Sequence, residues 1–119
     1  MTTGGQFYDV IENLKDPTRS LAQAAPDTWA GFADLHRTAV AEGARTAKVK
    51  ELMAMSIATD KQCDGCIGPH AIAAARRGAT AQEVAEALGV TLLMDGGTAS
   101  VYGSRAWAAY HEFADPNPS

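Results

Sequence analysis

The sequence is poor in cysteine and in aromatic residues, and it has no long apolar run. Two cysteines in 119 residues cannot build a disulfide framework. No apolar run approaches the roughly 18–20 residues that span a bilayer, and the N-terminus lacks a signal-peptide pattern. We therefore expect a cytoplasmic protein with no membrane partner. Aromatic residues make up only 7% of the chain, so its core must depend on many small contacts, largely from alanine.

Positive charge is also scarce. The chain has 10 lysines and arginines against 14 aspartates and glutamates, which gives a formal net charge of −4 at pH 7. Its basic residues are scattered, except for the adjacent pair Arg76-Arg77. A phosphate backbone is bound through a continuous positive field, which this chain lacks. We therefore expect no nucleic-acid partner.

The chain reads as one all-α domain over residues 1–119, because apolar residues recur at helical spacing and no strand pattern competes. Turn signals divide it into about six helices. In the third expected helix, one apolar stripe is formed by Val49, Leu52, Met53, Ser56 and Ile57. The first three helices are expected from about Gln6 to Leu14, ending at Asp16-Pro17, from Pro26-Asp27 to Gly43, and from a Thr46 cap to about Asp60.

The fourth helix follows the cysteines and ends at Arg77, with Gly78 as its C-terminal cap. Pro69 favours a helix that begins near Gly65 or Cys66, which would place the proline in the first turn. A fifth helix starts at a capping box in Thr80-Ala81-Gln82-Glu83, in which we assign the threonine and glutamine side chains as the caps. Gly96-Gly97 then separates a sixth helix, about 98–113, from a tail at 115–119 that cannot continue it.

Four chemically active side chains are gathered in one short stretch: Glu51, Cys63, Cys66 and His70. Their spacing is Glu-x11-Cys-x2-Cys-x3-His, and both cysteines of the protein belong to it. Two thiols three residues apart can react with each other or bind a metal. At a helix N-terminus the helix dipole favours the thiolate form of Cys66, and His70 lies one turn further on the same face.

Each of these residues also has a structural interpretation. Glu51 can be a proton-relay carboxylate, or a solvated glutamate paired with Lys48 one turn back, which the helical pattern alone somewhat favours. The cysteines can be small buried side chains. A metal site would need Cys63, Cys66 and His70 with a fourth ligand such as His36 or His111, although no second ligand pair is present. We expect His36 and His111 to pack on helix faces, and Met53, Met55 and Met94 to fill the core.

The run from Glu51 to His70 resembles the alkylhydroperoxidase D-like core of the carboxymuconolactone decarboxylase superfamily. The resemblance covers about half the chain, from Lys48 to Trp107, and its four-residue spacing is far more specific than a bare Cys-x2-Cys. The helix pattern agrees independently. Further parts of the match are Arg77-Gly78-Ala79-Thr80, then Glu83-Val84-Ala85-Glu86-Ala87-Leu88, and then Gly96-Gly97 before an alanine-rich helix.

The resemblance implies an oligomeric fold of about six helices and a thiol-dependent peroxidase without a bound cofactor or metal. By analogy, Cys66 would attack a hydroperoxide and Cys63 would then close a redox-active disulfide with it. Glu51 and His70 would relay the proton. An external dithiol or a lipoyl-bearing protein would be the reductant. The family's best-characterised peroxidases have a second histidine between the two cysteines. In this sequence Gly65 stands at that position.

Two other functions remain open at this stage. The decarboxylases of the superfamily act on a lactone of aromatic catabolism without a cysteine pair, and a non-catalytic thiol redox module would show a reversible disulfide without turnover. The chain should also form a homo-oligomer, a trimer or hexamer by resemblance, because a small alanine-rich domain buries a limited share of its surface. Trp29, Phe32, Trp107 and Phe113 are the side chains that we expect at its subunit boundary.

Overall fold

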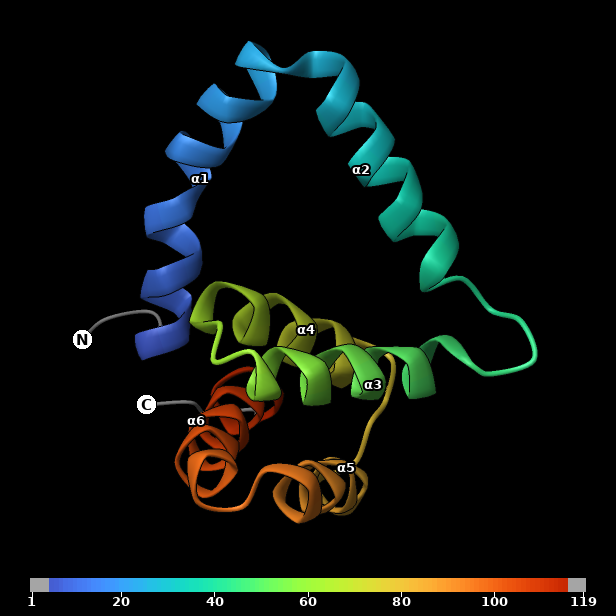
Figure 1. Cartoon of the computed structure of the whole chain (residues 1–119), viewed down its shortest axis with the longest axis vertical. Helices are drawn as coiled ribbons and strands as arrows, with labels where there is room; N and C mark the ends of the chain where they lie inside the picture. The colour runs from blue at the N-terminus through green and yellow to red at the C-terminus, as the bar shows by residue number, and fades with distance from the viewer. Residues whose placement is uncertain (1–4, 116–119) are drawn as a thin grey trace.

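The computed structural model describes residues 5–115, and these residues form helices and loops with no strand. The all-α prediction is therefore confirmed. Helices α3 and α4 lie side by side at the centre, α5 and α6 pack on one side of them, and α1 and α2 form a wedge on the other (Figure 1). The six helices are α1 Gln6–Ala24, α2 Pro26–Ala39, α3 Ala47–Asp60, α4 Asp64–Arg76, α5 Ala81–Asp95 and α6 Gly97–Ala114.

Helix α4 is the centre of the core. Its residues Ile67, Ala71 and Ala74 are completely buried, and they pack among side chains from four other helices. Most of these neighbours are small or medium-sized, as the composition predicts. They include Phe7 from α1, Met55 and Ala58 from α3, Val84 from α5, and Ala106, Ala109 and Tyr110 from α6.

Helix α1 is longer than predicted, because it continues through Asp16-Pro17 to Ala24. Proline inside a helix lacks the backbone donor and crowds the preceding turn, which costs about 3 kcal/mol. The residues after it nevertheless suit a helix, and Arg19 forms a 2.7 Å ion pair with Asp16 across the proline. The predicted end of this helix was therefore wrong.

The first turn of α1 is fixed by contacts from α6 and α4. The carboxylate of Glu112 accepts hydrogen bonds from the backbone N–H groups of Gly5, Phe7 and Tyr8 at 3.1, 3.2 and 2.7 Å. On the α4 side, a Cβ built on Gly68 would stand 3.2 Å from Ile11 Cδ1. Glycine thus allows α1 to approach α4 closely.

Helix α2 is the outer arm of the wedge, and none of its residues is buried. Phe32 and Leu35 are 58% and 62% exposed. The helix begins at Pro26 as predicted, but it ends at Ala39 and not at Gly43. The predicted helix end was placed at the glycine, whereas the chain leaves the helix at Val40 and passes through bends before α3.

Only part of the apolar stripe predicted on α3 faces the core, because Leu52 packs against it. Met53 and Ile57 are 48% and 58% exposed, and a shallow apolar groove runs between them and Val90 of α5. Of the three methionines expected in the core, only Met55 is buried, whereas Met94 is 76% exposed. The core-filler prediction was therefore wrong for Met53 and Met94.

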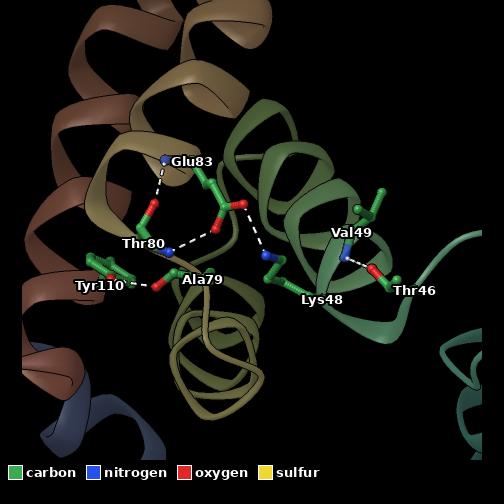
Figure 2. Close-up of polar contacts among 7 residues, drawn as sticks. All are labelled: Thr46, Lys48, Val49, Ala79, Thr80, Glu83 and Tyr110. Atoms are coloured by element: carbon green, nitrogen blue, oxygen red, sulfur yellow. Dashed lines mark hydrogen bonds and ion pairs between the residues drawn. The ribbon is translucent and has the colours of Figure 1, made fainter.

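Two threonine caps set the starts of α3 and α5, as predicted (Figure 2). Thr46 accepts from the backbone N–H of Val49 at 3.2 Å. Thr80 accepts from the N–H of Glu83 at 3.1 Å, and the Glu83 carboxylate accepts from the N–H of Thr80 at 2.9 Å. The second cap is therefore Glu83 and not Gln82, because a capping box joins the cap residue to the third helical position.

Glu83 also links α5 to α3, because its carboxylate accepts a 2.9 Å hydrogen bond from Lys48 Nζ. The N–H of Thr80 and this ammonium group hold the pKa of Glu83 below its usual value. Nearby, Tyr110 donates its hydroxyl to the carbonyl of Ala79 at 2.6 Å (Figure 2), and its burial raises the pKa of the phenol.

The C-terminal ends of α4 and α5 lie close to the predicted positions. Gly78 and Gly96 have φ angles of 85° and 69° and end α4 and α5, a left-handed conformation that glycine adopts freely. Part of the predicted tail, residues 116–119, lies outside the described residues. No helix within residues 5–115 combines the length and the hydropathy that a bilayer span requires.

Candidate functional site

Cys63 and Cys66 lie at the N-terminus of α4 and are joined by a disulfide, with their Cα atoms 5.2 Å apart. Cys63 is the N-cap residue, and its carbonyl accepts from the N–H groups of Cys66 and Ile67 at 2.9 and 2.8 Å. Cys66 is exposed and Cys63 is half-buried. The helix thus starts at Asp64, slightly earlier than predicted, and Pro69 lies in its second turn.

The turn before Cys63 positions the thiol pair. Gln62 has a φ of 56°, and the N–H groups of Gln62 and Cys63 donate to the carbonyls of Thr59 and Ala58 at 3.1 Å each. This pattern is a Schellman ending of α3 in which glutamine takes the left-handed position usually held by glycine. That conformation costs a non-glycine residue about 1–2 kcal/mol. It brings the end of α3 directly to the start of α4.

An ion pair holds Asp64, one of the two residues between the cysteines. Arg105 of α6 binds the Asp64 carboxylate with two hydrogen bonds, one of them from Nε to Oδ1 at 3.2 Å. Its guanidinium also lies 5.7 Å from the ring centroid of Phe7 and 5.6 Å from that of Tyr102. The Asp64 carboxylate raises the pKa of Arg105 further. Sequence analysis missed this pair, because the two residues are 41 positions apart.

Glu51 and His70 form the second part of the site. Nδ1 of His70 lies 2.8 Å from Oε1 of Glu51, whose side chain is only 4% exposed. Lys48 pairs with Glu83, so the interpretation of Glu51 as a solvated partner of Lys48 was wrong. An ionised carboxylate can only accept hydrogen bonds, so opposite an ionised Glu51 it is Nδ1 that carries the proton, and Nε2 is then the ring nitrogen left to exchange one.

A second imidazole lies beside His70. The ring of His36, from α2, is stacked on that of His70 with the centroids 5.9 Å apart and the planes 24° apart. Periodicity placed His36 on a helix face but did not indicate this neighbour. His111, by contrast, packs edge-on against Trp107 at 4.5 Å, as expected of a residue on a helix face.

Gly65 lies between the two cysteines, where the peroxidases that this sequence resembles have a second histidine. A Cβ built there would stand 3.1 Å from Cδ1 of Leu14 in α1. The Leu14 side chain would therefore have to shift by a few tenths of an ångström to admit a side chain at position 65. Across residues 5–115, no group of three or more His, Cys, Asp or Glu side chains is arranged to hold a metal ion.

The fold and this site define a class of protein: an all-α domain with a vicinal cysteine pair at a helix N-terminus and, one turn away, a half-buried histidine paired with a buried glutamate. The sequence profile of the carboxymuconolactone decarboxylase family matches residues 26–109. The chain belongs to the carboxymuconolactone decarboxylase family, in the superfamily that includes the alkylhydroperoxidase D-like proteins.

Individual relatives agree with this placement. An uncharacterised protein of Cupriavidus necator is 36% identical over 91 residues, which cover 76% of this chain and 80% of the relative. Uncharacterised protein 4 in the cox locus of Paracoccus denitrificans is 35% identical over 81 residues, covering 68% and 73%. The crystal structure of a carboxymuconolactone decarboxylase family protein from Legionella pneumophila matches with a TM-score of 0.89 and 34% identity, over 92% of this chain and 97% of that one.

Proposed function

We propose that this protein is a thiol-dependent peroxidase that reduces hydroperoxides through the Cys63–Cys66 pair. The observation that carries the proposal is the position of the exposed residue Cys66 at the N-terminus of α4, one turn before a histidine bonded to a buried carboxylate. A helix N-terminus stabilises a thiolate, and a positioned imidazole can accept or return a proton. The pair is thus placed for chemistry rather than for packing.

The reaction balances with the groups at the site and an external dithiol. The Cys66 thiolate attacks the terminal oxygen of the hydroperoxide, the O–O bond breaks, and the alcohol leaves with a proton supplied through His70. The Cys63 thiol then attacks the resulting sulfenic acid, which releases water and forms the disulfide. A dithiol reduces this disulfide by exchange and becomes a disulfide itself. A lipoyl group is one such dithiol.

We assign the proton transfer to His70, with Glu51 fixing its tautomer and stabilising the imidazolium that forms. General acid–base catalysis of this kind contributes about 10²–10⁴-fold. His36, stacked on His70, brings a second imidazole to the site, in a chain whose position 65 has none. We therefore include His36 among the residues that support the relay.

We also propose that the protein works as a homo-oligomer. Helix α2 buries no residue, and Met53, Ile57, Val90 and Leu93 are between 48% and 80% exposed. Exposed apolar area of this extent marks an interaction surface. Light scattering coupled to size exclusion should give a multiple of 12.5 kDa. A folded, cooperative monomer at micromolar concentration would refute this.

Peroxide consumption with dithiothreitol as the dithiol tests the proposed activity. Wild type should turn over, and Cys66→Ser should lose the activity while keeping its helical circular dichroism. Ser56→Ala, a small change on α3 away from the cysteines, serves as a control. If a lyase activity survives replacement of both cysteines, the protein is a decarboxylase of the family's name-giving type. A reversible disulfide without turnover would indicate a redox module instead.

A further inference from the structure

A groove of about 670 Å³ lies between the C-terminal part of α2 and the outer face of α4. Glu51 lines it, so the groove reaches the carboxylate that holds His70. Val40 and Ile72 contribute apolar wall. Its size is in the range of small-molecule sites, which are mostly apolar with a few polar groups that orient the ligand. The groove therefore adjoins the Glu51–His70 pair and continues toward the C-terminal end of α4.

Apart from Glu51 and His36, the polar side chains that line this groove are arginines. Arg37 comes from α2, and Arg76 and Arg77 come from the end of α4. Arg37 shares its charge with Asp34 at 2.9 Å, whereas no ion pair within residues 5–115 involves Arg76 or Arg77. Three arginines thus line one cavity in a chain whose net charge is −4.

Cys66 and Arg77 lie on the same face of α4. Cys66, His70, Ala73 and Arg77 follow one another at intervals of four, three and four residues, which is the spacing of a single helix face. At about 1.5 Å per residue, Arg77 lies about 10 Å beyond His70 along the helix axis. A long ligand on this face can therefore reach Arg77 with one end and Cys66 with the other.

We propose that this groove binds an acidic organic hydroperoxide, whose carboxylate is held by Arg76, Arg77 and Arg37. Its apolar chain then lies against Ile72, and its hydroperoxide group lies at Cys66. Arginine suits this role because its planar fork binds a carboxylate through two parallel hydrogen bonds. This inference rests on the proposed peroxidase activity and adds the substrate class.

The first experiment varies the substrate. The rate of oxidation of the reduced protein is compared for linoleic acid hydroperoxide and for its methyl ester, with dithiothreitol as the dithiol. We expect the acid to react at least about tenfold faster at low ionic strength, and the preference to shrink as salt screens the arginines. Equal rates for acid and ester would overturn the inference and leave the peroxidase proposal intact.

The second experiment varies the arginines. In Arg76→Gln/Arg77→Gln the preference for the acid should fall by about tenfold while the rate with the ester stays unchanged. Arg19→Gln, which removes an exposed arginine of α1, is the matched control. Arg76 and Arg77 also lie where cations stabilise the end of a helix. If they do only this, the variant will lose some thermal stability but keep the preference, and the inference is then wrong.

A binding measurement separates this inference from the activity itself. Titration calorimetry with decanoate and with methyl decanoate uses the oxidised protein and needs no turnover. Decanoate should bind, the ester should bind at least about tenfold more weakly, and the double variant should remove the difference. Arginine-dependent binding without any peroxide turnover would refute the peroxidase but retain the site as an anion site. Absence of such binding would refute the site.

Discussion

Replacement of Glu51 by glutamine tests the Glu51–His70 pair most directly. In the structure Nδ1 of His70 lies 2.8 Å from Oε1 of Glu51. The glutamine amide has the size of the carboxylate and can still accept a hydrogen bond from Nδ1, but it has no negative charge. Because a neutral acceptor still satisfies the imidazole, the free energy of unfolding should change by no more than about 1 kcal/mol. The rate of reaction with peroxide should fall by about 10²-fold or more if the charge stabilises the imidazolium.

The partner variant His70→Ala should behave differently. It leaves the Glu51 carboxylate, 4% exposed, without its imidazole, and a buried polar group without a partner costs about 1–3 kcal/mol. Because the His70 side chain is itself 21% exposed, water can replace part of the lost contact, so the lower half of that range is expected. The double variant should be less destabilised than the sum of the two, by about 0.5 kcal/mol or more.

Urea unfolding at pH 7 measures the changes in the free energy of unfolding. Stopped-flow measurement of thiol loss with cumene hydroperoxide gives the rate of reaction with peroxide. Glu86→Gln removes an exposed glutamate on α5 and is the control for both assays. A folded Glu51→Gln protein that reacts as fast as wild type would exclude Glu51 from the mechanism. Additive effects of the two substitutions would show that the pair has no energetic coupling.

Three further changes test other parts of the structure. Thr80→Ala should lower the free energy of unfolding in urea by about 1 kcal/mol, because it removes a helix cap, whereas the exposed Thr98→Ala should change it by less than about 0.5 kcal/mol. Asp60 raises the pKa of Asp95, so the folded state holds that proton more tightly. Asp95→Asn should therefore raise the melting temperature at pH 7, and the gain should vanish as the pH falls below about 4 and wild-type Asp95 is protonated. His36→Asn should slow the peroxide reaction by up to about 10²-fold, less than loss of His70; a wild-type rate would remove His36 from the site.

The helix starts could be predicted because their signals are local. Thr46 and Thr80 cap the residues three positions later in the chain, and Pro26 begins α2. Helix ends and buried faces depend on distant contacts, which periodicity does not record. Helix α1 continues through Pro17 while docking against α4 and Glu112. Apart from Met55, the buried face of α3 carries small and polar side chains, so the apolar stripe did not identify it.

The candidate site shows the same division. The cysteines, Glu51 and His70 could be identified from spacing, because α3 and α4 follow each other through a short turn. His36 and Arg105 could not be placed there, because one lies on α2 and the other on α6. Their approach to α4 depends on how whole helices pack. The sequence therefore identified the chemically reactive residues of the site, but it did not identify the residues that surround them.

Gly65 links the packing of α1 to the chemistry of the site. Leu14 approaches position 65 closely, so an imidazole between the cysteines would require the Leu14 side chain to shift. The second imidazole instead comes from His36, on the arm that also carries Arg37 into the groove. In the proposed mechanism the two arms of the wedge therefore have separate roles. Helix α1 holds the start of α4 in place, and α2 supplies side chains to the proton relay and to the substrate groove.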